Sequence, residues 1–530
     1  MKKIVLVLLS VLLVLATLIS CSDNPETSTP KITTPKLDDT PEIPDDTEEN
    51  KNLNIDIDSI DYDNQMITVF HWQPARTDVT ISEFGMELEE IQNDAVNDAV
   101  YQRNLRTERD LGIDLDWVEQ SGSTYWKTRN FIDRLDARLA NPDTPVDIIA
   151  GCIRSMPFFM MEGYLTELNT YSDSLDFTKA WWPENIQDAI AIRGNLYFAS
   201  GDIAASVLQN MTVLYANKTR LEAIGQSYEG LMQKVLAYEW TIDDLISLTQ
   251  NEYADIDNVK GPSESDRFGL TTLYFYSDGL YTGLGYKYMI ESTKEGEYLR
   301  LASNLATETS MQYVQKIKDW QLDNDFFMKY TDAQEDTYQK TFKEGLALFA
   351  LDRGALGFEL QETDIKYACL PAPTIDGNQD RYYTNVNSSY TGYGICKQSI
   401  DYDIAAQTLQ VLGYHAYSTT TPTIFEVSFQ GKFAKDDYTI QMFNIIRESI
   451  VFDTGKVYDV FVATQIDGFV LPDFLESIVA NVLSYGIKGN EYGEDTNFNF
   501  PSMSDPVRNK VQKCIDSANK KIGEFLDSEE

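Results

Sequence analysis

Residues 194–225 read GNLYFASGDIAASVLQNMTVLYANKTRLEAIG and lie between two long blocks in which strands and helices are expected to alternate. Within the stretch, residues 196–199 and 211–215 are compact apolar runs of the kind that form buried strands. Gly201 and Asp202 separate the two runs. A polar break of this kind is where two lobes of a fold can meet, so the stretch predicts a crossing between lobes.

The block before this stretch predicts a parallel sheet. Residues 66–70 (MITVF), 113–117 and 146–150 have the apolar pattern of strands, and amphipathic helices are expected between them. This β-α-β-α-β order builds a parallel sheet covered by helices. Ligands of open sheets bind beyond the carboxyl ends of the strands. The candidate ligand contacts that follow these strands are Trp72, Arg154 and Ser155.

The block after the stretch repeats the pattern and then becomes mainly helical beyond residue 401. A capping box is expected where Thr241 precedes Asp244 by three residues. Strands are expected at residues 268–276, 346–350, 367–370 and 393–396. The candidate ligand contacts at or after their ends are Tyr276, Asp278 and Arg353, with Tyr390 in a polar loop and Asp202 at the break already described.

The N-terminus carries the most specific local signal. Lys2 and Lys3 precede an almost wholly apolar run, and small Ser20 then precedes Cys21. This arrangement resembles the lipobox of a bacterial lipoprotein, which implies a signal peptide at residues 1–20, cleavage before Cys21 and lipidation of its thiol. The run is short for a spanning helix, so we expect a protein that is anchored to a membrane without crossing it.

Composition narrows the remaining possibilities. A chain of 530 residues is too long for one ordinary core and favours two or more domains. Residues 21–63 are rich in proline, threonine and acidic side chains and are expected to form an extended tether. A formal net charge of -41 argues against nucleic acid as a partner, because phosphates are neutralised by clustered Lys and Arg.

Catalytic and metal-binding signatures are missing from the sequence. There are two histidines, and the four cysteines after Cys21 are widely spaced without a CxxC pair, so we expect no metal site and no cofactor. No nucleophile elbow, zinc-protease, P-loop or dinucleotide-binding motif is present. We therefore predict a protein that is not an enzyme, with a glycan-degrading lipoprotein as the least favoured alternative.

Seven groups of segments between residues 64 and 527 occur in an order that is typical of one family. They are MITVFHW with GIDLDWVE, VDIIAGC with GYLTELN, GNLYFASGD with VLYANKTRLEAIG, YEWTIDDL, FKEGLALFALDRG, DIKYACLPAP and TGYGICKQS. In these segments the sequence resembles the extracellular solute-binding proteins of ABC importers, the group that includes maltodextrin-binding proteins. The polar loop at 378–383 and the C-terminal third are longer than in the smallest family members, which leaves the size of the ligand open.

The resemblance implies an α/β, two-lobed periplasmic-binding-protein-like fold of type II, in which crossover strands join two mainly parallel sheets with flanking helices. It implies lobe 1 at residues 64–203 and 366–405, and lobe 2 at 204–365 and 406–530. Closure of the lobes on a solute would be sensed by a permease and its ATPases. The chain is expected to act as a monomer, anchored by lipid on the extracytoplasmic face of the cell membrane.

The expected ligand is a carbohydrate, an oligosaccharide held in the cleft between the lobes. Sugars are recognised by flat aromatic faces together with charged or amide groups that bind hydroxyls, and aromatic residues make up 12% of this chain. Peptides or other small polar solutes are the alternative ligands. A surface glycan-binding or sensor lipoprotein without a transport role is the alternative function.

Overall fold

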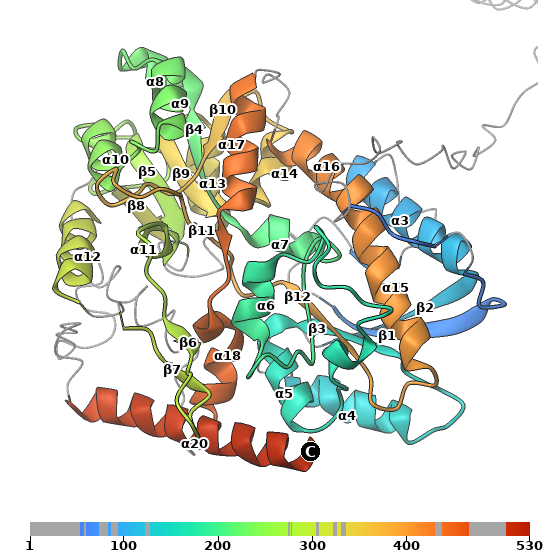
Figure 1. Cartoon of the computed structure of the whole chain (residues 1–530). Helices are drawn as coiled ribbons and strands as arrows, with labels where there is room; N and C mark the ends of the chain where they lie inside the picture. The colour runs from blue at the N-terminus through green and yellow to red at the C-terminus, as the bar shows by residue number, and fades with distance from the viewer. Residues whose placement is uncertain are drawn as a thin grey trace, which may run out of the picture. The chain divides into compact units, whose positions relative to one another are not determined.

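The computed structural model describes residues 53–57, 60–73, 83–85, 94–121, 128–273, 276, 278–303, 307–321, 326–329, 335–429, 437–465 and 505–529. The expected signal peptide, Cys21 and most of the expected tether lie outside these residues. The described strands form two main sheets with helices against them, as Figure 1 shows. Among the described helices, none combines the length and the apolar character that a membrane span requires.

The first sheet has the strand order β12-β3-β1-β2. Strand β1 (Gln65–Gln73) pairs in parallel with β2 (Ile113–Ser121) and β3 (Ile148–Cys152). Strand β12 (Thr391–Ile395) runs antiparallel to β3 at the edge. The three strands predicted before the central stretch are confirmed, and β1 and β3 are buried along most of their length, as expected for a sheet covered on both faces.

Helix α3 (Ala95–Leu111) joins β1 to β2, and local chemistry sets both of its ends. The Asp94 side chain accepts hydrogen bonds from the backbone N–H groups of Val96 and Asn97 at 2.9 and 3.0 Å, which caps the first turn. Gly112 ends the helix with a left-handed φ of 62°. A side chain at Gly112 would be strained there and would also place its Cβ 2.3 Å from an oxygen of Asp61.

The second sheet has the strand order β10-β4-β9-β5-β8. Strand β5 pairs in parallel with β8 and β9, whereas β4 runs antiparallel to both β9 and β10. The α/β class is confirmed, and this second sheet is mixed in direction because β4 runs opposite to its other four strands. The bounds are β4 (Thr212–Asn217), β5 (Phe268–Leu273), β8 (Phe326–Lys329), β9 (Ala347–Arg353) and β10 (Tyr367–Leu370).

The crossing between the sheets differs from the sequence prediction. Residues 211–215 belong to β4 as expected, but the prediction of a strand at 196–199 is wrong. That segment makes a single bridge, in which Ala199 and Tyr393 of β12 exchange two backbone hydrogen bonds of 2.8 Å. The chain then turns at Gly201 and enters helix α7 (Ala205–Asn210), whose six residues are all buried.

Two segments lie with a different sheet from the one that the expected lobe boundaries give them. Strand β10, expected in lobe 1, pairs with β4 in the second sheet. Residues 406–424, expected in lobe 2, lie in α15 (Tyr402–His415), η7 (Ala416–Thr420) and α16 (Thr421–Ile424), which contact α3 beside the first sheet. The apolar pattern of a helix in the sequence does not reveal which sheet that helix covers. The division into lobes stays a prediction.

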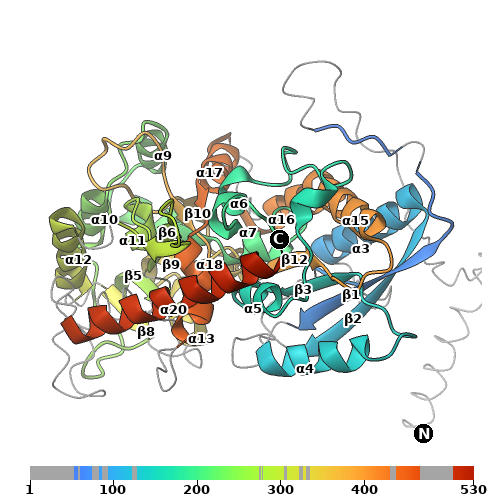
Figure 2. The ribbon, with the colours of Figure 1, turned by 60° about the horizontal axis from the view of Figure 1, so that its bottom comes forward.

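The remaining elements fill the layers around the sheets. Helix α20 contacts β7, α18 and α5, so it lies across elements next to both sheets (Figure 2). Two further pairs form small sheets, β6 (Met289–Glu291) with β7 (Leu299–Leu301) and β11 (Thr384–Asn385) with β13 (Ile450–Val451). The other helices are α4 (Thr128–Leu139), η3 (Ile153–Ser155), α5 (Met156–Met161), η4 (Leu168–Tyr171), α6 (Glu184–Ile190), α8 (Lys218–Ala223), α9 (Tyr228–Leu236), α10 (Ile242–Thr249), α11 (Asp278–Gly283), α12 (Glu308–Gln321), α13 (Glu335–Lys343), α14 (Leu356–Leu360), η8 (Phe425–Phe429), α17 (Asp437–Glu448), α18 (Thr454–Ala463) and α20 (Asp505–Glu529).

Candidate functional site

A cavity of about 480 Å³ surrounds Asp202. One wall comes from residues near the first sheet, including Tyr417 of η7, a helix that contacts α3. Another part of the lining comes from α17, which packs on β10 of the second sheet and contributes Arg447. The cavity therefore lies between elements that belong to the two sheets. Its polar and aromatic lining residues are Asn185, Asp202, Arg381, Tyr417, Asn444, Arg447, Glu448 and Phe452.

Asp202 is held in the wall of this cavity by contacts from both sides. Its Oδ1 accepts a hydrogen bond of 2.6 Å from the Thr421 hydroxyl and one of 2.8 Å from the Arg447 guanidinium. Burial raises the pKa of the Asp202 carboxyl, and the charge of Arg447 and the two hydrogen bonds oppose that rise. Both of these bonds use Oδ1, which leaves Oδ2 for a donor in the cavity.

An aromatic face and an amide stand close to this carboxylate. The Arg447 guanidinium lies 5.1 Å from the centre of the Tyr417 ring, which is half-buried and lines the cavity. The Asn185 side-chain amide donates to the backbone carbonyl of Ile450, which fixes the orientation of its amide group. The site thus offers a carboxylate, a guanidinium, an amide and the Tyr417 ring within a single cavity.

Sequence reasoning found Asp202 but missed its partners. Tyr417 and Arg447 lie on helical segments more than 200 residues away in the sequence, and neither follows a strand. The carboxyl-end rule therefore gives no reason to select them. The only local signal is the helical pattern of residues 437–448, which does not say which sheet that helix packs against.

Buried charges support the segment that carries Asp202. Glu83 accepts hydrogen bonds from the backbone N–H and the hydroxyl of Ser206, at 2.8 and 2.9 Å, in the first turn of α7. Arg103 of α3 donates to the carbonyl of Ile203 at 3.1 Å. Glu83 and Arg103 are 3% and 1% exposed, so these bonds are shielded from water. They fix the backbone on the C-terminal side of Asp202.

Three predicted ligand contacts lie in the core beside the first sheet and do not line the cavity around Asp202, namely Trp72 and Ser155, which were predicted after strands, and Tyr390, which was predicted in a polar loop. The Trp72 indole N–H donates to the Thr391 hydroxyl at 2.8 Å. The Ser155 and Thr128 hydroxyls are 2.7 Å apart and share a hydrogen bond. Tyr390 is 2% exposed and packs edge-on against another aromatic ring.

Arg154 and Asp278 both contact helix α18. The Arg154 guanidinium donates to both carboxylate oxygens of Asp459, at 3.2 and 2.8 Å. Asp278 forms an ion pair with Lys456, and the two side chains are 1% and 5% exposed. One helix of this chain therefore occupies the space in front of both residues, which follow β3 and β5.

Tyr276 lies beyond the end of β5, next to Arg353, the last residue of β9. The Arg353 guanidinium carbon is 5.4 Å from the centre of the Tyr276 ring, and both residues are buried. Of the eight predicted ligand contacts, Asp202 is the one that lines this cavity, and a ligand role for all eight stays a prediction.

Three carboxylates among the described residues come close enough to one another to hold a metal ion. Oxygens of Asp255, Asp257 and Asp266 lie within 4.8 Å of one another. Each of them already accepts hydrogen bonds within the loop, such as those from the Ile256 and Ser263 N–H groups to Asp266 at 2.8 and 2.9 Å. Their place in the loop is explained by these bonds.

No family model and no curated protein matches the chain. Among solved structures, the maltose-maltodextrin binding protein of Alicyclobacillus acidocaldarius is 13% identical, with 86% of this chain and 100% of that chain covered and a TM-score of 0.47. An ABC substrate-binding protein of Listeria monocytogenes in complex with cycloalternan is 13% identical, over 87% and 100% of the chains, with a TM-score of 0.46. The GacH receptor of Streptomyces glaucescens, solved unliganded and with acarbose, is 13% identical, over 88% and 99%, with a TM-score of 0.46. Likenesses of this size do not transfer a ligand to this chain.

Proposed function

We propose that the chain captures a saccharide in the cavity around Asp202, as the solute-binding subunit of an ABC importer. The observation that carries the proposal is the composition of that cavity. A carboxylate, a guanidinium, an amide and an aromatic ring converge in about 480 Å³, within the size range of small-molecule sites.

Each of these groups has a task in binding a sugar. The Oδ2 atom of Asp202 and the Asn185 amide can pair with hydroxyl groups, which are costly to bury without partners. The Tyr417 ring offers an apolar face to the C–H groups of a sugar ring. The Arg447 guanidinium is both a donor and a neighbour of that ring, so one side chain links the polar and the apolar halves of the site.

The position of the cavity supports capture by closure. Its walls belong to elements packed on different sheets, so a ligand that contacts both walls stabilises one relative arrangement of the sheets. Such a population shift is the signal that a permease would read. The lipid anchor at Cys21 completes the proposal, because it would keep the protein next to its membrane partners.

A saccharide panel tests the proposal. Binding stabilises a protein by RT ln(1 + [L]/Kd), so a ligand at 100 times its Kd raises the unfolding free energy by about 2.7 kcal/mol. We expect at least one oligosaccharide to raise the melting temperature and to give a saturable calorimetric signal. Shifts with peptides and none with a broad set of sugars at millimolar concentration would favour the alternative ligand class.

A further inference from the structure

We propose that a second cavity, of about 490 Å³, binds an organic cation such as an amine. It shares no lining residue with the cavity around Asp202. Its walls come from four segments of the chain, namely the start of η4, residues 193–197, the β6–β7 hairpin and the end of α20. The side chains that carry the argument are Glu167, Glu295, Asp527, Glu529, Tyr197 and Tyr298.

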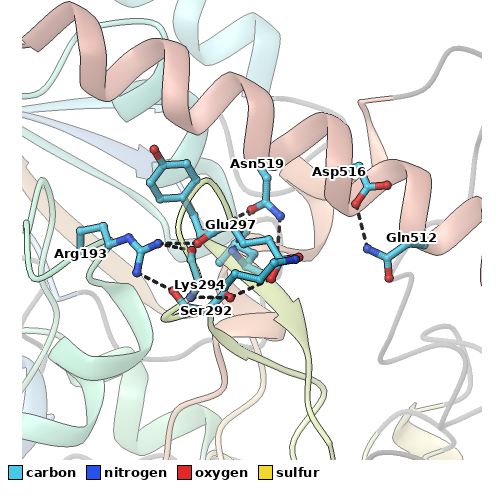
Figure 3. A network of polar contacts seen from close by, with 9 residues as sticks. Arg193, Ser292, Lys294, Glu297, Gln512, Asp516 and Asn519 are labelled. Carbon is cyan, nitrogen blue, oxygen red and sulfur yellow. Dashed lines mark hydrogen bonds and ion pairs between the residues drawn. The ribbon is translucent and has the colours of Figure 1, made fainter.

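The walls of this cavity are held in place by a polar network (Figure 3). The Arg193 guanidinium donates to the backbone carbonyls of Ser292, Lys294 and Glu297 at 2.8, 2.6 and 2.7 Å. Asn519 of α20 holds the same hairpin, because its Oδ1 accepts from the Leu299 N–H at 2.7 Å and its Nδ2 donates to the Leu299 carbonyl at 3.0 Å. The hairpin is thus fixed against both neighbouring segments, which lowers the cost of ordering a site there.

The charge in the walls is negative. Four carboxylates line the cavity against one guanidinium, that of Arg193, whose N–H groups bond to the hairpin carbonyls. Lys397, which does not line the cavity, pairs with Glu529 at 2.7 Å. No ion pair joins Glu167 to another described residue. A cationic ligand would therefore find carboxylates to pair with.

Tyr197 supplies a second, independent observation that points to a ligand in this cavity. Its side chain is 2% exposed and lines the cavity, and its ring is fixed 5.1 Å from that of Phe525. Its hydroxyl makes no hydrogen bond with any described residue and is accessible from the cavity, so it is available to a ligand. Burial and the carboxylates of Glu167 and Glu529 raise the pKa of this phenol to about 12, so it stays neutral and can accept a hydrogen bond from an ammonium group.

The geometry favours an organic cation over a metal ion. A metal requires several oxygen ligands at 2.0–2.6 Å. Within the described part of the chain, the single group of three carboxylates whose oxygens lie within 4.8 Å of one another is in the loop at 255–266. That loop does not line this cavity. An ammonium group carries three donors, which suit the carboxylates of the walls and the Tyr197 hydroxyl, whereas the Tyr298 ring already has the Arg193 guanidinium 5.3 Å from its centre.

Calorimetric titration of the full chain with putrescine, at an ionic strength of about 0.15 M, tests the proposal. Glu167→Gln should weaken binding about three- to tenfold, the effect of losing one partly exposed charged contact. The matched control is Glu222→Gln on α8, an exposed site that loses the same charge outside the cavity, and it should change the affinity less than about twofold. Tyr197→Phe keeps the packing on Phe525 and should weaken binding about two- to fivefold.

Two results would overturn the proposal. One is the absence of saturable binding by the unaltered protein up to about 10 mM putrescine. The other is an equal loss in Glu167→Gln and Glu222→Gln, which would mean that the diamine responds only to the net charge of the whole protein. Asp202→Asn should leave putrescine binding unchanged, so the outcome does not depend on whether the first cavity binds a saccharide.

Discussion

Replacing Asp459 by Asn should destabilise the protein far more than an equally simple change in an exposed ion pair. Asp459 is 1% exposed in its side chain, and its partner Arg154 is 13% exposed. The substitution keeps the shape of the side chain but removes the negative charge that faces a nearly dry guanidinium. Removing one partner of a buried pair costs 3–5 kcal/mol, and the partial exposure of Arg154 lowers our expectation to about 2–3 kcal/mol.

Chemical denaturation of the unaltered protein and of Asp459→Asn measures this difference in unfolding free energy. Glu162→Gln is the matched control, because Glu162 pairs with Arg129 and the two side chains are 32% and 59% exposed. That change should cost less than about 1 kcal/mol. Equal losses in the two variants would refute the reasoning that burial of the Arg154 pair makes α18 a structural anchor of the first sheet.

Three other changes have defined outcomes. His71 is buried and stacked on Phe84, and burial lowers its pKa to about 4, so the unfolded chain binds a proton at His71 before the folded chain does as the pH falls from about 6.5. The unfolding free energy, measured by urea unfolding, should therefore be about 2 kcal/mol lower at pH 5 than at pH 8. His71→Gln should remove this dependence on pH. Thr241→Ala removes the capping box of α10 and should lower the unfolding free energy by about 1 kcal/mol in the same assay, with exposed Ser172→Ala as a neutral control. Cys21→Ala should release the protein from the membrane fraction of cells, and full membrane retention would contradict the lipid anchor.

The strands could be predicted from the sequence wherever a buried run keeps one apolar pattern. Strands β1, β4 and β10 lie where β-branched and aromatic residues predict them. The segment at 196–199 has the same composition and still forms no strand, because its backbone meets β12 only at Ala199. Strand pairing depends on partners that are distant in the sequence, and composition does not contain that information.

The candidate site was only partly predictable for a related reason. The carboxyl-end rule locates Arg154 and Asp278 correctly beyond their strands. It does not foresee that α18 returns to this place and pairs Asp459 and Lys456 with them. Asp202 was predictable because a charged residue in an apolar stretch requires an explanation, whereas Tyr417 and Arg447 have no such contrast with their neighbours.

The most direct test of the proposed function is calorimetric titration of Asp202→Asn with whichever saccharide binds the unaltered protein. The variant should lose at least about tenfold in affinity, because a charge-assisted hydrogen bond in the cavity is removed and Arg447 loses its partner. Asp173→Asn, an exposed change outside the cavity, should bind like the unaltered protein. Unchanged affinity in Asp202→Asn, with the protein still folded, would contradict the placement of the saccharide beside Asp202.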